Sequence, residues 1–439
     1  MITYDDLSVF LLKCTRNLIA MFRGRFAAGR FAKKEAPIME ITLSERVMRL
    51  KPSASIAAKA IVNDLRAKGR RIVDFTVGEP DLDTPAHIID VAVAAMRNGD
   101  THYTASNGTP ALRRAIAAKL QRENGVSMAD AEIVVGIGAK QLIFESFAAT
   151  LNDGDEVIVP APFWVSYPDI VALNGGTPVI VSCPRETGFK LTPAQLEAAI
   201  TPRTRWVILC APSNPTGALY SRDELEGLAG ALRAHPHVAV MTDDIYEHLV
   251  YDDVTPHALL AIAPDLRPRV VMINGMSKAY AMTGWRVGYA AGPAPVIAAI
   301  TKLLGQSTTC ACSFAQAAAV EALSGDQTAL HDMVAIYQRR RNLMFEALKA
   351  IPGIDCDLPE GAFYIYPDVS GLLGKQTPDG KRIETDLDLS LYLLEAVGVA
   401  VMDGTSYGVS PCLRLSFATS EDVITEGCAL IAQACAALK

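Results

Sequence analysis

The 439-residue chain lacks the features that mark membrane, disulfide-rich and nucleic-acid-binding proteins. No segment offers about 20 uncharged apolar residues, so we expect no membrane-spanning helix. The nine cysteines include no C-x-x-C pair and their number is odd, which favours free thiols in a reducing, cytoplasmic compartment over a disulfide framework. The formal net charge is −7 and no strong basic stripe dominates the chain. We therefore expect no nucleic-acid partner.

Metal-ligand spacing, internal repeats and low-complexity segments are also missing. The seven histidines are scattered, and the closest pair, His235 and His237, flanks a proline in a predicted turn, so we expect no metal site. The chain does have length and apolar content. Its 439 residues with 50% hydrophobic composition are enough for a large core and two domains.

The first 38 residues have an unusual charge pattern. Residues 7–22 are largely apolar, and several basic residues follow them. A secretory signal would place positive charges before its apolar segment, where this chain has Asp5 and Asp6. We interpret residues 1–38 as an N-terminal extension that is disordered, an amphipathic arm, or the product of a start site read upstream of Met39.

Short β-branched runs alternate with helical periods through the middle of the chain, which predicts a mostly parallel sheet with helices on both faces. The predicted strands are 71–76, 132–135, 156–159, 178–181, 205–210, 238–242, 269–273, 363–366, 399–402 and 412–417. The predicted helices are 55–68, 86–97, 110–123, 139–151, 163–173, 192–200 and 221–233. We expect an α/β fold with a large domain over 86–325 and a smaller α+β domain formed by 39–85 and 326–439.

A glycine-rich segment follows the strand 132–135, and ligands of open α/β sheets bind at the carboxyl ends of strands. The segment reads Gly136-Ile137-Gly138-Ala139-Lys140-Gln141. It half-matches a dinucleotide fingerprint, but Gln141 occupies the position of the third glycine, so we do not expect a nicotinamide cofactor. Free N–H groups at a helix start suit a phosphate, and a simple tight turn is the alternative.

Three further strand ends have polar groups. Asn214 lies between two prolines, in a rigid turn that would aim its amide. Asp243 follows the next strand, where a buried carboxylate needs a cationic or protonated partner. Lys278 follows the apolar run 269–273 among small and aromatic residues, so burial should lower its proton affinity and leave a nucleophilic amine. A rigid turn alone, a solvated loop acid and a loop-capping lysine are the respective alternatives.

Together these groups suit one cofactor. A phosphate site, an amine, a carboxylate for a pyridinium nitrogen and donors for a phenolic oxygen match pyridoxal 5′-phosphate. Ser277 and Arg286 are close enough in the sequence to Lys278 to hold an anion beside it. Arg414 stands in an alternating strand with apolar neighbours, which favours a carboxylate-binding role over a surface salt bridge.

With these motifs the chain resembles the fold-type I pyridoxal-phosphate-dependent transferases, in particular the class I/II aminotransferases of the prokaryotic aspartate aminotransferase branch. The likeness covers about residues 40–439. The motifs that support it are Lys51-Pro52-Ser53-Ala54, Gly78-Glu79-Pro80-Asp81, Asn214-Pro215-Thr216-Gly217, Asp243-x-x-Tyr246, Ser277-Lys278, Gly284-Trp285-Arg286-Val287-Gly288-Tyr289 and Arg414-Leu415-Ser416-Phe417-Ala418.

The resemblance implies three catalytic residues. Lys278 would form a Schiff base with the cofactor and move the substrate's α-proton as general base and then general acid. Asp243 would keep the pyridinium nitrogen protonated, which makes the ring an electron sink. Tyr246, with Asn214, would donate hydrogen bonds to the phenolic oxygen of the cofactor.

The resemblance also implies which residues hold the cofactor and the substrate. The remaining cofactor-binding residues would be Tyr103, Gly138, Ala139, Lys140, Trp164, Ser277 and Arg286. Tyr103 would reach the phosphate bound by a partner subunit, which implies a homodimer with composite active sites. The substrate would contact Gly78, Lys140, Trp164, Asn214 and Arg414.

For the reaction, the resemblance implies transfer of an amino group from L-aspartate or L-glutamate to a 2-oxo acid such as 2-oxoglutarate, with Lys140 binding the distal carboxylate. A prephenate or aromatic amino-acid aminotransferase is the alternative, followed by a C–S lyase. A cofactor-sensing regulator is disfavoured because residues 1–38 are too few for a DNA-binding domain. Two departures from the family pattern are Gly275, where other branches have serine for a phosphate contact, and Cys310-Ala311-Cys312 near the expected dimer interface.

Overall fold

The computed structural model describes residues 41–48, 50 and 54–439. The predicted N-terminal extension 1–38, the alternative start at Met39 and the motif residues 51–53 lie outside the described residues. The chain divides into two units, Met1–Glu45 and Arg46–Lys439, and the fold described below is that of the second unit. Among the described residues, no helix is both long and apolar enough to cross a membrane.

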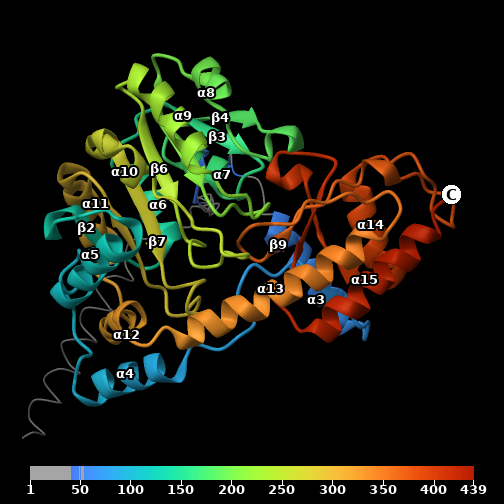
Figure 1. The fold of residues 1–439 in the computed structure, drawn as a ribbon, viewed down its shortest axis with the longest axis horizontal. Coiled ribbons are helices and arrows are strands. Elements are labelled where there is room, and N and C mark those ends of the chain that lie inside the picture. The colour runs from blue at the N-terminus through green and yellow to red at the C-terminus, as the bar shows by residue number, and fades with distance from the viewer. Residues whose placement is uncertain (1–40, 49, 51–53) are drawn as a thin grey trace, which may run out of the picture. The chain divides into compact units, whose positions relative to one another are not determined.

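A mostly parallel sheet of seven strands forms the centre of the described fold (Figure 1). The five strands from β4 to β7 in spatial order pair in parallel, whereas β8 runs antiparallel to both β2 and β7. In spatial order the strands are β2 (Ile133–Gly136), β8 (Gly288–Ala291), β7 (Val270–Gly275), β6 (Ala239–Asp243), β5 (Thr204–Cys210), β3 (Glu156–Ala161) and β4 (Thr177–Ser182). The predicted mostly parallel sheet is confirmed.

Helices cover both faces of this sheet, as the alternate side chains of a strand indicate. In β7, Val270 and Met272 belong to one hydrophobic cluster, whereas Val271 and Ile273 belong to another. Burial on both faces explains the near-continuous apolar runs of the strands. The first cluster includes residues of α4 (Ala86–Arg97), α5 (Pro110–Asn124), α8 (Pro193–Ala199), α9 (Arg222–Ala234), α10 (Leu259–Ile262) and α12 (Ser313–Ser324). The second includes residues of α6 (Ala139–Ala148), α7 (Tyr167–Leu173) and α11 (Ala294–Ser307).

Two small sheets and the C-terminal helices form the rest of the fold, together with α3 from near the chain start (Figure 1, orange to red, and blue). Val62 of α3 clusters with Leu394 and Ala400. Strand β1 (Val73–Asp74) pairs in parallel with β10 (Val399–Ala400), and β12 (Leu413–Ser416) lies between β11 (Met402–Asp403) and β9 (Tyr364–Ile365). The helices are α2 (Glu45–Met48), α3 (Ala54–Ala67), α13 (Thr328–Lys349), α14 (Asp386–Val397) and α15 (Glu421–Ala436). The domain boundaries at 85/86 and 325/326 stay a prediction.

Some element boundaries differ from the sequence predictions. The helix expected at 163–173 begins at Tyr167. The segment before it forms a turn, in which Tyr167 N–H donates to Trp164 O, and the backbone N–H of Phe163 donates to Tyr407 O, at 3.0 Å. The strand β8 was not predicted, since Gly288-Tyr289-Ala290-Ala291 contains no β-branched residue. Short 3₁₀ segments complete the fold, namely η1 (Asp130–Glu132), η2 (Arg185–Thr187), η3 (Pro264–Arg269), η4 (Ser370–Leu372) and η5 (Thr405–Tyr407).

Candidate active site

A cleft of about 690 Å³ lies where β5, β6 and β7 end. Its walls come from both parts of the fold, since they include the segment 76–79 and Arg414 of β12 as well as the ends of the central strands. Of the predicted site residues, those that line the cleft are Gly78, Ala139, Lys140, Trp164, Asn214, Asp243, Tyr246, Ser277, Lys278, Arg286 and Arg414.

Lys278 lies in the turn that follows β7 and is half-buried. Its Nζ donates a hydrogen bond to Gly78 O, at 2.6 Å, and lies 5.9 Å from the centre of the Tyr246 ring. Burial lowers the pKa of Lys278 to about 8, against the opposing effect of the Glu79 carboxylate. A useful fraction of the amine is therefore neutral, and so nucleophilic, near neutral pH.

Asp243 is the last residue of β6, and only 4% of it is exposed. Its Oδ2 accepts a hydrogen bond from Tyr167 Oη, at 2.5 Å. Its Oδ1 is buried without a hydrogen-bond partner among the described residues. Burial raises the pKa of Asp243 to about 6, although the Tyr167 hydrogen bond opposes this shift. An unpaired buried carboxylate oxygen calls for a protonated or cationic partner in the cleft.

Arg414 of β12 is held by two hydrogen bonds and still has N–H groups that are not bonded to any described residue. Nη1 donates to Asn214 Oδ1, at 3.2 Å, and Nη2 donates to Thr76 O, at 2.6 Å. Nε is buried without a partner among the described residues. A guanidinium fixed in this way can present two parallel N–H groups to a carboxylate. Because Asn214 accepts through its carbonyl oxygen, its amide NH₂ is left to donate into the cleft.

The start of α6 forms an anion-binding end of the site. Gly138 caps this helix with φ 92°, in the left-handed region that favours glycine. A Cβ at Gly138 would come within 2.5 Å of Arg286 Nη2. Arg286, itself at φ 56°, donates to Ile137 O, at 3.2 Å, so its guanidinium lies against the turn before the helix. Gly138 thus shapes the site without lining the cleft, and the helix N-terminus and Arg286 together suit a phosphate.

Lys140 and Trp164 lie together at the same cleft. Lys140 Nζ is 4.6 Å from the centre of the Trp164 ring, and burial together with the charge of Arg286 lowers its pKa. Trp164 packs edge-on against Tyr167, with ring centres 5.3 Å apart. Tyr103 does not line the cleft and is 87% exposed, so it would need a second molecule to act on a cofactor.

The structure adds residues that the sequence prediction missed. Tyr167 bonds Asp243 across 76 sequence positions, and Tyr364 bonds Tyr246 across 118. No local spacing links such positions, although Tyr167 lies in the helix predicted at 163–173 and Tyr364 in the strand predicted at 363–366. The structure explains why glycine, and not serine, occupies position 275: a Cβ there would lie 2.9 Å from Gly288 Cα of the neighbouring strand. A serine at this position would force β7 and β8 apart.

Glu123, Glu247 and His248 are arranged closely enough to hold a metal ion. However, the side chain of Lys119, which is 1% exposed, contacts Glu247 and lies 3.5 Å from Glu123. Its ammonium group neutralises the carboxylates that an ion would need. We interpret this cluster as an ion-pair network that packs α5 against the segment after β6.

Comparison with known proteins identifies the family. The chain matches the family model of class I and II aminotransferases over residues 70–431. It belongs to this family. The aminotransferase is 51% identical over 396 residues to the aspartate/prephenate aminotransferase of Cereibacter sphaeroides, which covers 90% of this chain and 99% of the relative. It is 50% identical over 374 residues to an aspartate aminotransferase of Rhizobium meliloti, covering 84% and 90% of the two chains.

Solved structures agree with this assignment. The aspartate aminotransferase from Rhizobium meliloti matches this aminotransferase with a TM-score of 0.90 and 46% identity, over 91% of this chain and 100% of that one. Thermus thermophilus aspartate aminotransferase with maleate matches with a TM-score of 0.84 and 39% identity, over 90% and 100%. The predicted family, the fold-type I architecture and the cofactor, pyridoxal 5′-phosphate, are confirmed.

The cleft of this aminotransferase fits that cofactor. The unpaired Oδ1 of Asp243 can accept from a pyridinium N–H. Lys278 has an amine of lowered pKa that could react with the aldehyde, and the start of α6 with Arg286 could hold the phosphate. Tyr246 and the Asn214 amide line the same cleft and can donate hydrogen bonds to a phenolic oxygen.

Proposed function

We propose that this aminotransferase moves the amino group of L-aspartate or L-glutamate to a 2-oxo acid such as 2-oxoglutarate, by a ping-pong mechanism. The observation that supports this substrate class is the presence of two separate cations, Arg414 and Lys140, on one cleft. A dicarboxylic amino acid has one carboxylate for each of them. The relative from Rhizobium meliloti is named an aspartate aminotransferase, and the Thermus thermophilus structure is described with maleate, a dicarboxylate.

The bound cofactor supplies an electron sink for the charge that develops at the substrate's α-carbon. Arg414 binds the α-carboxylate and orients the Cα–H bond toward Lys278. Lys278 Nζ, as a free amine, would take the α-proton of the substrate and later return it, acting as general base and then general acid. Asp243 would place a negative charge beside the pyridinium nitrogen, and Tyr246 and Asn214 would hold the phenolic oxygen by donating hydrogen bonds to it. Lys140 selects for a second carboxylate.

We further propose that the active unit is a homodimer in the cytoplasm. Tyr103 is 87% exposed, and the apolar side chains of Ile137 and Phe144, beside the phosphate end, are each 36% exposed. A partner subunit would cover such side chains. All the cysteines of the described residues are free thiols, which suits a reducing compartment.

Prephenate is the second candidate substrate. The relative from Cereibacter sphaeroides, at 51% identity, is named an aspartate/prephenate aminotransferase. Prephenate is also a dicarboxylate, so the same two cations, Lys140 and Arg414, suit it. A C–S lyase would use the same Lys278, Asp243 and Arg414, but it would need no 2-oxo acid acceptor.

A panel of amino donors, assayed with 2-oxoglutarate as acceptor, tests the proposal. We expect aspartate to give a higher kcat/KM than phenylalanine, with oxaloacetate as product and no turnover when the acceptor is omitted. Prephenate is tested with glutamate as its donor. A higher kcat/KM for phenylalanine or prephenate would contradict the aspartate assignment, and pyruvate or ammonia release without an acceptor would indicate a lyase.

A further inference from the structure

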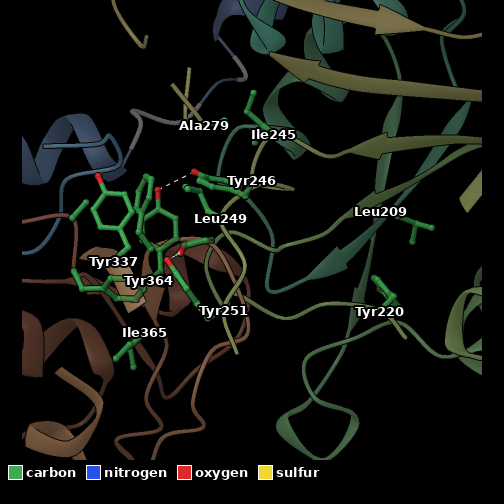
Figure 2. Close-up of a cluster of buried hydrophobic side chains, with 14 of the residues drawn as sticks. Leu209, Tyr220, Ile245, Tyr246, Leu249, Tyr251, Ala279, Tyr337, Tyr364 and Ile365 are labelled. Atoms are coloured by element: carbon green, nitrogen blue, oxygen red, sulfur yellow. Dashed lines mark hydrogen bonds between the residues drawn. The ribbon is translucent and has the colours of Figure 1, made fainter. Parts of the chain in front are cut away.

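Tyr364 lies at the junction of the two parts of the site. It belongs to β9, which pairs with β12 so that Tyr364 stands opposite Ser416, two residues from Arg414. Its side chain is fully buried. Its Oη lies 3.0 Å from Tyr246 Oη, and Figure 2 shows the two hydroxyl groups directed at each other. Tyr364 Oη has no other hydrogen-bond partner within the described part of the chain.

If Tyr246 acts as proposed, only one of the two tyrosines can be the donor of the hydrogen bond between them. A phenol has a single proton to donate. When Tyr246 donates that proton to the phenolic oxygen of the cofactor, its own oxygen can only accept from Tyr364. The hydroxyl of Tyr364 is therefore the donor, and it has no competing acceptor among the described residues.

The surroundings of Tyr364 keep its hydroxyl group protonated and therefore able to donate. Burial raises the pKa of Tyr364, although the positive charge of Arg414, whose guanidinium lies 4.5 Å from the ring centre, opposes this shift. Gly78 leaves room on the other side, since a Cβ there would approach Tyr364 Oη to 3.3 Å. Hydrogen bonds in such a buried chain polarise one another.

We propose that Tyr364 is a positioning residue of the active site that acts through Tyr246. Its hydroxyl donates to Tyr246 Oη, fixes the direction of the Tyr246 proton and strengthens the donation of Tyr246 to the phenolic oxygen of the cofactor. This inference rests on the proposed function and assigns to Tyr364, which also lines the cleft, a role that is exerted through Tyr246.

The test is the Tyr364→Phe variant of the cofactor-loaded enzyme, measured by pH titration of its visible absorbance. Donation to the phenolic oxygen stabilises its negative charge, so it favours loss of the proton that this oxygen shares with the Lys278 nitrogen. Without the Tyr364 hydroxyl, Tyr246 donates more weakly to the phenolic oxygen, so the midpoint pH of the absorbance change should rise. We expect an upward shift of a few tenths of a pH unit, because neighbouring hydrogen bonds strengthen each other only modestly, by roughly 10–30%.

The decisive comparison is a double-mutant cycle with Tyr246→Phe, which alone should raise the midpoint further. In that background Tyr364→Phe should add no shift, since its effect passes through the Tyr246 hydroxyl. Tyr251→Phe is the matched control, because Tyr251 is equally buried but donates to Ala362 O (Figure 2). It should leave the midpoint unchanged even if it lowers the melting temperature.

An unchanged midpoint in Tyr364→Phe, or the same shift with and without the Tyr246 hydroxyl, would overturn the inference. If the single variant fails to fold, Tyr364→His and Tyr364→Leu are compared instead. Tyr364→His keeps a hydrogen-bond donor, so its midpoint should lie closer to that of the unsubstituted enzyme than the midpoint of Tyr364→Leu. Equal midpoints for these two variants would also overturn the inference. The unsubstituted enzyme separates the two proposals, because a protein without the pH-dependent band or without transamination would refute the proposed function itself.

Discussion

The substitution Arg414→Lys gives a quantitative prediction for substrate binding. It keeps the positive charge on β12 but replaces a planar fork by a single ammonium group. Arg414 is 4% exposed, and its hydrogen bonds to Asn214 and Thr76 hold the fork in one orientation. The unpaired Nε is then available with a terminal N–H for the α-carboxylate. Lysine can supply only one of these two donors in the same geometry.

The magnitude follows from the bond that is lost. A hydrogen bond to a charged group contributes about 1.5–3 kcal/mol, and about 1.4 kcal/mol corresponds to a factor of ten. We therefore expect Arg414→Lys to lower kcat/KM by about 10- to 150-fold for every donor that has an α-carboxylate. The assay is the half-reaction with aspartate and with glutamate, followed by cofactor absorbance.

Two comparisons make this result specific. An amine without an α-carboxylate should react with similar efficiency in Arg414→Lys and in the unsubstituted enzyme. Arg341→Lys is the control for loss of a buried guanidinium, because Arg341 bonds Pro359 O and Asp252 outside the cleft. It should keep kcat/KM within about twofold. A loss below about threefold in Arg414→Lys, or an equal loss for the carboxylate-free amine, would refute the assignment.

Three further outcomes are expected. Lys140→Ala should lower kcat/KM about tenfold or more for aspartate and little for phenylalanine, and an equal loss for both would contradict its role. Gly138→Ala should weaken cofactor binding about tenfold in an absorbance titration, because left-handed φ costs about 1–2 kcal/mol and the methyl group would meet Arg286; an unchanged Kd would argue against the phosphate site. The rate at which cofactor-free protein takes up pyridoxal phosphate should rise with pH and level off above about pH 8, where Lys278 becomes neutral. A flat profile would contradict this.

The same lowered pKa of Lys278 has a consequence for stability with a definite sign. The folded state disfavours the charged amine, whose ordinary value is 10.5. The cofactor-free protein is therefore destabilised below about pH 8 and regains this free energy as pH rises from about 8 to 10.5.

Much of the central sheet was predictable because burial on two faces demands apolar, β-branched strands. The strand β7 illustrates this, since Val270 to Ile273 alternate between the two clusters. In contrast, β8 consists of small residues that fit between β2 and β7, and only tertiary contact makes them a strand. The start of α7 was predicted too early, because the segment before it forms a turn that contacts Tyr407, far away in the sequence.

The same distinction applies to the site. The placement of Asp243, Asn214 and Lys278 in one cleft was predictable, because ligands of such sheets bind at the carboxyl ends of the strands. Tyr167 and Tyr364 could not be predicted as site residues, because their hydroxyl groups hydrogen-bond to Asp243 and Tyr246, which are far away in the sequence. The residues at the strand ends can be found from the strand pattern, whereas the tyrosines that hydrogen-bond to them are brought there only by the fold.

The most direct test of the account is to locate the lysine that binds the cofactor. The protein is loaded with pyridoxal phosphate, reduced with borohydride, digested and analysed by mass spectrometry. We expect the added mass on the peptide containing Lys278, and we expect Lys278→Ala to lose both the visible absorbance band and turnover. Label on a different lysine, or a Lys278→Ala variant with the band and normal turnover, would contradict the account.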